Sequence, residues 1–250
     1  MNSLVIIPAF NESKTIKSVV EQVHKYTDKI LVIDDCSTDN TSKNLENCVV
    51  VRNEKNLGKG ASLRRGFKYA IKNGFDPIIM LDADGEHNPD DIPVFLNALK
   101  TADFVIGQRS VQRSFGRYLL NQFSSFWFNL IFKNLTDTQC GFRAIRVDLL
   151  KKMNLNKSKF DLEMEMLLEA VKNNARIIPL HLKALHNSSS HVTLADYLKI
   201  NNAFDEWVIK NYDYLNISSF NKILLSFFAP IGLLAGNFLL KFTGGQNGSS

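Results

Sequence analysis

An apolar stretch at positions 78 to 92, IIMLDADGEHNPDDI, ends in a run of carboxylates. In order, these are Asp82, Asp84, Glu86, Asp90 and Asp91. Carboxylates gathered in one place repel one another unless a cation neutralises them, and clusters of oxygen ligands alone suit Mg²⁺ or Mn²⁺. The last two acids follow Pro89, so they have a second interpretation as the start of a helix. The first two predict a divalent cation held against a diphosphate.

The elements that position these acids follow from the pattern of apolar residues. The runs LVIIPAF, KILVIDD and PIIMLDAD alternate with TIKSVVEQVHKY and with a helix-like stretch from Ala61 to Asn73. Apolar strands without polar alternation are typical of a parallel sheet covered by helices on both faces, so the pattern predicts an α/β fold. We expect Asn11 or Ser13 to cap the first helix, Gly74 to end the second, and Pro77 to open the third strand.

Polar residues follow each of these three strands directly. They are Asn11 and Glu12 after the first, Asp34 and Asp35 after the second, and Asp82 and Asp84 after the third. Ligands of open parallel sheets bind outside the carboxyl ends of the strands, where the loops converge. The acids are therefore expected to share one edge of the sheet.

Size and composition limit the remaining options. The chain has 250 residues and 45% apolar content, which suits one large domain or a domain with a small appendage. Its formal charge of +5 mildly favours anionic partners. Three cysteines without a C-x-x-C pair indicate neither a disulfide framework nor a zinc site and suit a reducing cytosol. The short apolar run that stops at Pro8 lacks the features of a signal peptide.

Five segments in this order and spacing resemble the inverting glycosyltransferase family 2: VIIPAFNE, VIDDCSTDNT, NLGKGASLRRGF, LDADGEHNPDDI and DTQCGFRAI. The chain is most similar to polyprenol-phosphate (dolichol-phosphate) hexosyltransferases, from about Leu4 to about Lys199. The resemblance implies the GT-A fold, a Rossmann-like three-layer sandwich with a mostly parallel central sheet. It also implies metal-dependent, inverting transfer of a hexose from a nucleotide sugar of the GDP-mannose or UDP-glucose type to polyprenyl phosphate at the cytosolic face of a membrane.

Two alternatives to this function stay open. One is a family 2 transferase that acts on a glycan or another hydroxyl acceptor, with Asp161 as the base. The other is a non-enzymatic module that binds a nucleotide sugar. No nucleic-acid partner is expected.

The resemblance assigns the nucleotide-sugar site to Pro8, Phe10, Glu12, Asp35, Lys59, Asp82 and Asp84. A carboxylate such as Asp35 accepts hydrogen bonds from base N–H groups or ribose hydroxyls, and Phe10 offers an aromatic packing surface. Lys59, between Gly58 and Gly60, would offset the charge of the diphosphate; its alternative is a solvated loop cation. Asp34 would instead order the turn before a helix that starts at STDNT.

By the same resemblance, Asp84 and Glu86 are the metal ligands for Mg²⁺ or Mn²⁺. The polyprenol-phosphate enzymes commonly have Gln where this chain has Glu86, which places one more negative charge beside the cation. The metal would act as a Lewis acid on the leaving nucleoside diphosphate.

The acceptor phosphate is assigned by resemblance to Arg109, Arg117, Ser190 and His191. The planar guanidinium of arginine suits phosphate, and Arg113 is an alternative to Arg117 because the spacing in the family varies. His191 has the alternative of an ordinary surface or core histidine. The catalytic residues are expected to be Asp84 and Arg117, with Asp161 added for a hydroxyl acceptor; Asp161 is otherwise a helix cap.

The resemblance also implies that the acceptor side of the cleft includes Asp137, Gln139 and Gly141. Cys140 is expected to be a small structural residue. The helix FDLEMEMLLEAVKNN is expected to leave its glutamates solvated, namely Glu163, Glu165 and Glu169. An aromatic stripe upstream is either core or a surface for lipid, and it consists of Phe123, Phe126, Trp127 and Leu130.

The C-terminal segment is uncharged from Ile223 to Leu240, between Lys222 and Lys241. It is marginal as a membrane span, which needs about 20 apolar residues. We expect residues 1–215 to form the catalytic domain, 216–243 a hydrophobic helical segment that holds the protein on the membrane, and 244–250 a disordered tail. The alternatives for the middle segment are a buried helix or a homo-oligomer contact.

Overall fold

The chain is described here from a computed structural model. The structure describes residues 2–43, 45–109, 131, 135, 137–138, 140–157, 161–182, 194–211, 213, 224–226, 229–230, 234 and 237.

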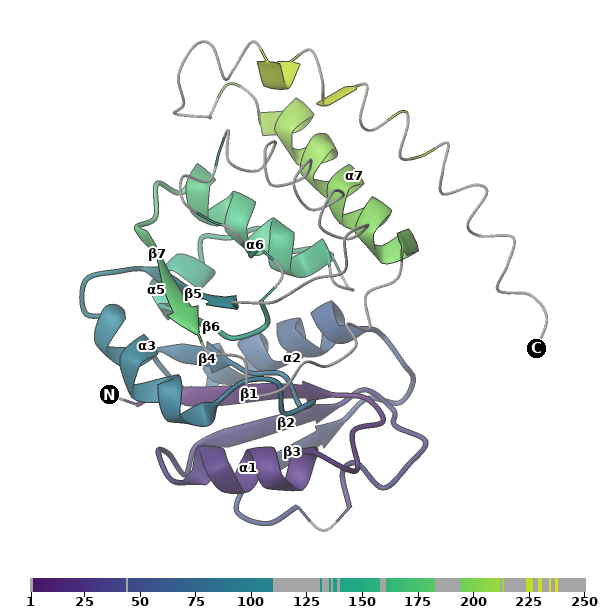
Figure 1. The fold of residues 1–250 in the computed structure, drawn as a ribbon, viewed down its shortest axis with the longest axis vertical. Coiled ribbons are helices and arrows are strands. Elements are labelled where there is room, and N and C mark those ends of the chain that lie inside the picture. Colours follow the sequence, from purple (N-terminus) through teal and green to yellow (C-terminus); the bar gives the residue numbers. More distant parts are fainter. Residues whose placement is uncertain are drawn as a thin grey trace, which may run out of the picture.

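Within the residues that the structure describes, seven strands form one sheet in the order β3-β2-β1-β4-β6-β5-β7 (Figure 1). They are β1 (Leu4–Ala9), β2 (Ile30–Asp34), β3 (Val49–Arg52), β4 (Ile78–Met80), β5 (Phe104–Arg109), β6 (Arg143–Ile145) and β7 (Ile177–Leu182). Strand β6 runs antiparallel to both of its neighbours, β4 and β5, whereas every other pair is parallel. The predicted α/β fold with a mostly parallel sheet is confirmed.

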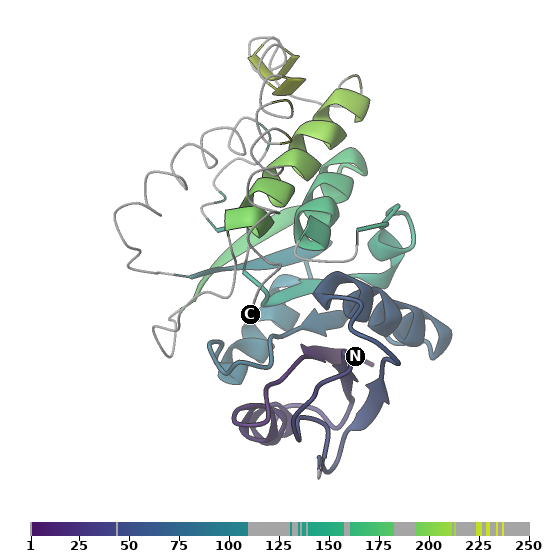
Figure 2. The same cartoon turned by 90° about the vertical axis from the view of Figure 1, so that its right-hand side faces the viewer.

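Helices cover both faces of this sheet (Figures 1 and 2). They are α1 (Ile16–His24), α2 (Lys59–Lys72), the 3₁₀ turn η1 (Pro89–Asp91), α3 (Ile92–Ala98), α5 (Val147–Leu150), α6 (Asp161–Lys172) and α7 (Leu194–Asn211). Strand β1 shows why there are two cores, since Leu4 and Ile6 pack with α2 and α6, while Val5 and Ile7 pack with α1 and α3. Successive strand residues point to opposite faces, so an unbroken apolar strand requires a helix layer on each side.

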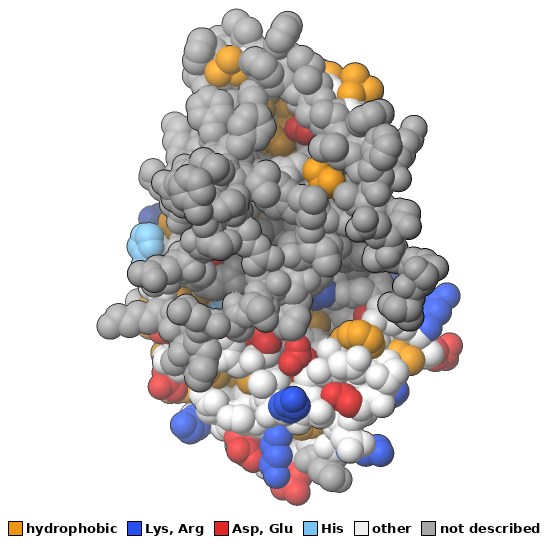
Figure 3. All heavy atoms as spheres, turned by 45° about the vertical axis from the view of Figure 1, so that its right-hand side comes forward, with side chains coloured by type: hydrophobic (Ala, Val, Ile, Leu, Met, Phe, Trp, Pro, Cys, Tyr) orange, Lys and Arg blue, Asp and Glu red, His pale blue; other side chains and the backbone are white. Residues whose placement is uncertain are grey.

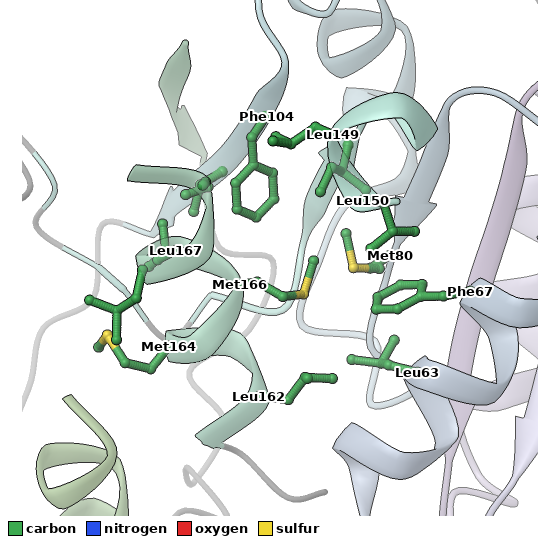
Figure 4. Close-up of a cluster of buried hydrophobic side chains, with 14 of the residues drawn as sticks. Leu63, Phe67, Met80, Phe104, Leu149, Leu150, Leu162, Met164, Met166 and Leu167 are labelled. Carbon is green, nitrogen blue, oxygen red and sulfur yellow. The ribbon is translucent and has the colours of Figure 1, made fainter. Parts of the chain in front are cut away.

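Helices α2 and α6 meet in the first of these cores. Figure 4 shows Leu63 and Phe67 of α2 facing Leu162 and Met166 of α6, with Met80 of β4 between them. This packing brings the N-terminal ends of the two helices to the edge of the sheet where β4 ends.

Local predictions were partly wrong at the helix starts. Thr15 occupies the N-cap position of α1 without a side-chain hydrogen bond, so neither Asn11 nor Ser13 caps it. Instead, Asn11 Oδ1 accepts from the amide of Thr38, and the Ser13 amide donates to Asp39, because these residues tie the β1 loop to the β2 loop.

Three further local predictions have clear outcomes. Gly74 ends α2 as expected, with a φ of +68° and its amide donating to the Ile71 carbonyl. Pro77 lies one residue before β4. The helix expected at STDNT is wrong, because residues 38–43 form bends and turns.

The acids after Pro89 also behave differently from one another. Asn88 is the N-cap of η1, and its side chain accepts from the amide of Asp90. Asp91 occupies the N-cap position of α3 but makes no side-chain capping bond. Asp90 and Asp91 therefore lie at a helix start, as expected, but the side-chain capping hydrogen bond comes from Asn88.

Two buried residues of the C-terminal segment belong to the core. Leu225 and Ala229 lie in the same cluster as Phe204 and Trp207 of α7. In contrast, the Leu234 side chain is 72% exposed. Within the described part of the chain, none of the helices is both long and apolar enough to cross a bilayer. The apolar C-terminal helix is not established, and the expected boundaries at 215 and 243 stay predictions.

Candidate active site

Asp34 organises the turn that follows β2. Its carboxylate is fully buried, accepts from the Ser37 amide at 2.8 Å, and pairs with the guanidinium of Arg52 at the end of β3. Burial opposes the charged form, but hydrogen bonds from Ser37 and Ser42 and the charge of Arg52 outweigh it and lower the pKa of Asp34. The prediction that Asp34 orders this turn is confirmed.

Asp35 holds the loop that leads into α2. Its two oxygens accept from Asn53 Nδ2 at 2.7 Å, from the Leu57 amide at 2.9 Å and from the Gly58 amide at 2.7 Å. Gly58 adopts a φ of +91°, which favours glycine. Asp35 thus positions the start of α2, and its contact with a base or ribose stays a prediction.

The end of β1 lies beside this turn. Pro8 is buried within β1, while the Phe10 side chain is 44% exposed just beyond the strand. The Glu12 amide donates to Thr41 Oγ1 at 2.7 Å, and its carboxylate accepts from Thr15 Oγ1 at 3.1 Å. The structure therefore brings the β1 and β2 loops together, and the Phe10 ring beside them is partly exposed to solvent.

Lys59, the first residue of α2, lies between two carboxylates. Its Nζ atom is 2.7 Å from Asp82 Oδ1 and 2.7 Å from Glu163 Oε1 of α6. Burial would lower the pKa of Lys59, but Asp82 and Glu163 outweigh it and raise the pKa. Lys59 is therefore not a solvated loop cation, and any charge that it lends to a diphosphate is shared with these two acids.

The prediction that the α6 glutamates are solvated is wrong for Glu163 and Glu169, while Glu165 is half-buried. Glu163 is only 2% exposed and Glu169 is also buried, where it accepts from Trp207 Nε1 at 3.1 Å. Helix α6 is covered by α2 on one side and α7 on another, so most of its circumference is core. Its acids are buried because Lys59 and Trp207 supply partners.

Asp82 lies beside Lys59, His87 and the backbone of Gly141. Burial alone would raise its pKa, but the charge of Lys59 and then the neighbouring His87 keep the pKa of Asp82 well below its usual range. His87 is buried, and its Nε2 atom lies 3.8 Å from Asp82 Oδ2. The backbone of Gly141 lies close to the same carboxylate, since a Cβ atom at Gly141 would be 2.0 Å from Oδ2.

Asp84 has the opposite electrostatic environment. Burial and then the charge of Asp82 raise its pKa, and the amide of Glu86 donates to its Oδ1 at 2.9 Å. Among the residues that the structure describes, no group of three or more His, Cys, Asp or Glu side chains is arranged to hold a metal. Asp84 and Glu86 nevertheless fit a Mg²⁺ or Mn²⁺ that takes its other ligands from phosphates and water, as such ions usually do.

The loop that contains Gly141 is held by a buried arginine that the sequence analysis missed. Arg143 donates through Nε to the Cys140 carbonyl at 2.8 Å, and through its two Nη atoms to the carbonyls of Thr138 and Glu163, each at 2.6 Å. Cys140 is fully buried, which confirms its structural role. Asp137 is also buried, and its amide donates to Gln108 Oε1.

The remaining predicted site residues are placed only in part. Arg109 ends β5, although its side chain is not described, and Asp161 begins α6 two residues before Glu163. Several predicted residues lie outside the described part of the chain: Arg113, Arg117, Phe123, Phe126, Trp127, Leu130, Gln139, Ser190 and His191. Their roles stay predictions.

With the geometry in place, comparison with known proteins decides the family. Residues 4–153 match the family described as glycosyl transferase family 2, which is more than half of the chain. The chain belongs to this family. The relatives of this glycosyltransferase include proteins named for transfer to polyprenyl phosphates.

Two of these relatives cover most of the chain. The undecaprenyl-phosphate mannosyltransferase of Micrococcus luteus is 29% identical over 198 residues, which span 71% of this chain and 81% of that protein. The UDP-N-acetylglucosamine–dolichyl-phosphate N-acetylglucosaminyltransferase of Methanococcus voltae is 31% identical over 218 residues, 74% of this chain and 86% of that protein.

Solved structures confirm the GT-A architecture. Glucosyl-3-phosphoglycerate synthase of Mycobacterium tuberculosis, in complex with Mn²⁺, UDP-glucose and phosphoglyceric acid, matches with a TM-score of 0.70 at 20% identity. The match covers 82% of this chain and 79% of that one. The same synthase also has a structure with Mg²⁺ and UDP. At this identity the likeness establishes the fold.

Proposed function

We propose that this glycosyltransferase transfers a hexose from a nucleotide sugar to a polyprenyl or dolichyl phosphate, with inversion, at the cytosolic face of a membrane. The observation that carries the proposal is the similarity, across more than 70% of the chain, to proteins named for polyprenyl-phosphate sugar transfer. The donor-side residues support it, because the loops after β1, β2 and β4 meet at the edge of the sheet where such folds bind nucleotides.

Asp84 and Glu86 would hold a Mg²⁺ or Mn²⁺ at this edge. The raised pKa of Asp84 supports this role, since a buried carboxylate beside Asp82 favours a nearby cation. When bound, the metal stabilises negative charge on the leaving nucleoside diphosphate.

The donor would lie across the loops after β1 and β2. Phe10 offers its exposed ring to the base or sugar, and Glu12 lies beside it on the same loop. Asp35 keeps the glycine-flanked start of α2 in place, so that Lys59 lies near the diphosphate. These residues bind and orient the donor.

On the acceptor side, a lipid phosphate needs no protein base. Its second pKa lies near 6, so at neutral pH an anionic oxygen is available as the nucleophile. This oxygen forms a bond to the anomeric carbon while the bond from that carbon to the diphosphate oxygen breaks, which inverts the configuration. Arg109 and Arg117, together with Ser190 and His191, would hold the acceptor phosphate.

Membrane attachment through residues 216–243 is part of the proposal. Among the described residues of this segment, Leu225 and Ala229 are buried, whereas Leu234 is exposed. A chain that ends at Pro230 keeps the buried part and removes the rest. If this shorter chain and the full chain fractionate alike and act equally on a long-chain lipid acceptor, the segment is not an anchor.

A second candidate is transfer to a hydroxyl acceptor, with Asp161 as the base. It is favoured by the structural similarity to a synthase crystallised with phosphoglyceric acid and by the position of Asp161, which lies two residues from the Lys59 partner Glu163. Asp161→Asn should abolish transfer to a hydroxyl and leave transfer to a lipid phosphate largely intact, because only the former requires a base.

The decisive experiment offers the full-length chain a panel of GDP- and UDP-sugars with Mg²⁺ or Mn²⁺. Each is paired with a short polyprenyl phosphate, the corresponding polyprenol, or phosphoglyceric acid, and products are identified by mass. Formation of a glycosyl phosphate lipid supports the proposal. Product with the polyprenol or phosphoglyceric acid alone supports the hydroxyl candidate, and absence of metal-dependent nucleoside diphosphate release supports a binding module.

A further inference from the structure

Glu163 links three parts of the site, namely the start of α2, the turn after β4 and the loop before β6. Its Oε1 atom is 2.7 Å from Lys59 Nζ, which also lies 2.7 Å from Asp82 Oδ1. Its Oε2 atom is buried and has no hydrogen-bond partner within the described part of the chain. A buried carboxylate that depends on one ammonium is costly unless that pairing is kept.

The backbone of Glu163 is fixed as firmly as its side chain. The Arg143 guanidinium donates to the Glu163 carbonyl at 2.6 Å and to the carbonyls of Thr138 and Cys140 on the neighbouring loop. That loop continues into Gly141, whose backbone leaves no room for a side chain beside Asp82. Asp82 is therefore held from two directions, by Lys59 and by the Gly141 backbone, and both connect to Glu163.

We propose that Glu163 is a positioning residue of the sugar transfer, which acts through Lys59 to fix Asp82 beside the metal ligand Asp84. This inference rests on the proposed function. Glu163 anchors the flexible lysine to α6, so that the ammonium meets Asp82 at one oxygen. Asp82 then points toward α2, and Asp84 and Glu86 are left to face the cation.

Charge gives a second reason for this arrangement. Replacing Glu163 removes one negative charge beside Lys59, so the field of the ammonium would weaken the attraction between Asp84 and a divalent cation. The metal affinity should therefore fall even though Glu163 itself is not a ligand. Outer residues that orient metal ligands typically change affinity by about 10- to 100-fold when they are replaced.

The test compares Glu163→Gln with Glu165→Gln. Both lie on α6, but Glu165 accepts from the amides of Asn156 and Lys157, away from Lys59. Mn²⁺ binding to each full-length variant is measured by electron paramagnetic resonance without any donor or acceptor. Nucleoside diphosphate release then gives kcat and the donor KM. For Glu163→Gln we expect Mn²⁺ binding weakened about tenfold and a reduced kcat, with the donor KM changed by less than about twofold.

Lys59→Arg is the second variant, and it keeps the charge but replaces the compact ammonium with a wider planar group. It should also weaken Mn²⁺ binding, and the losses of Lys59→Arg and Glu163→Gln should not add in the double variant, because both act on Asp82.

Wild-type Mn²⁺ affinity in folded Glu163→Gln, or in Lys59→Arg if the former does not fold, would overturn the inference. A lower thermal stability with unchanged Mn²⁺ affinity overturns it too, because Glu163 would then be a packing residue. Mn²⁺ binding is measured without an acceptor. If the proposed acceptor class is incorrect, the product panel shows it, and the Mn²⁺ test of Glu163 is unaffected.

Discussion

The two acidic turns that flank the end of β1 differ in what their carboxylates face. After β2, Asp34 and Asp35 accept hydrogen bonds from backbone amides, from Asn53 and from Arg52, so their charge is satisfied by their own chain. After β4, Lys59 neutralises Asp82, whereas Asp84 meets the like charge of Asp82. The turn after β2, with Asp34 and Asp35, is therefore a scaffold turn. The turn after β4, with Asp82 and Asp84, is the metal turn, because its negative charge is not fully balanced and can attract a cation.

This difference shows that the number of acids in a motif says little about metal binding. Both turns have two acids at the end of a buried parallel strand, and both lie next to β1 in the sheet. What separates them is the supply of donors, because a carboxylate that already accepts several N–H hydrogen bonds has little need for a metal. Acidic and basic side chains are also interspersed over the described part of the surface in Figure 3.

The largest expected effect comes from removing the carboxylate of Asp84. Asp84→Ala should reduce metal-dependent transfer by at least about 100-fold, because the cation loses a direct ligand. The fold should be retained, because the half-buried Asp84 is not a core residue. Nucleoside diphosphate release and circular dichroism measure the two outcomes.

Asp90→Ala is the matched control, since Asp90 belongs to the same acidic run but bonds to Tyr26 at the surface. Its activity should equal that of the wild type. Full activity of Asp84→Ala, or of the wild type in excess chelator, would remove the distinction between the two turns.

A stability measurement probes the scaffold turn. Asp35→Ala removes the acceptor of the Leu57 and Gly58 amides and of Asn53, so the free energy of unfolding should fall by about 3 kcal/mol. Urea denaturation would show this loss. Glu54→Ala, in the same loop but exposed, should change the free energy by less than about 0.5 kcal/mol. If Asp35→Ala also lowered the free energy of unfolding by less than about 0.5 kcal/mol, water would be replacing the hydrogen bonds of Asp35 without loss of stability.

The contact between the metal turn and the loop before β6 can be tested next. Gly141→Ala places a methyl group against Asp82, so the carboxylate or the loop must move, and the free energy of unfolding should fall by roughly 1 to 3 kcal/mol. Because Asp82 moves, nucleoside diphosphate release should fall as well. Unchanged stability and activity would show that the loop yields freely and that Asp82 is not held from this side.

Much of the scaffold was predictable from the sequence, and the reasons are local. The unbroken apolar runs LVIIPAF and KILVIDD predicted strands buried on both faces, and neither strand lies at an edge of the sheet. Strand β3 was missed because it is a short edge strand, with Val49 45% exposed. The antiparallel β6 was not predicted either, since a three-residue strand has too few positions for a period to appear.

The site was predictable where a motif sets the residue types, and less so where tertiary packing sets the partners. Asp82, Asp84 and Lys59 were found from their motifs, but the ion pairs of Lys59 were not. Glu163 was assigned to solvent because a glutamate on an amphipathic helix is usually exposed. Only the packing of α6 against α2 turns that glutamate toward Lys59, and no spacing within one helix contains this information.

The smallest expected effect is a pH-dependent change in thermal stability, and its sign separates the two turns. The pKa of Asp84 is raised above its ordinary value of 3.8, so ionised Asp84 disfavours the folded state. This penalty is absent below about pH 3.8 and grows as the pH rises through the raised pKa. Asp34 has a lowered pKa, so its stabilising contribution is instead present at neutral pH and lost in acid. Asp84→Asn should therefore raise the Tm of the metal-free protein by about 2 °C at pH 7.5 and leave it unchanged near pH 4. Differential scanning calorimetry in chelator measures both values, and added Mn²⁺ should raise the Tm of the wild type more than that of the variant, because only the wild type keeps this ligand. A Tm increase that is the same at both pH values would show that Asp84→Asn acts through packing and that the metal turn carries no unbalanced charge.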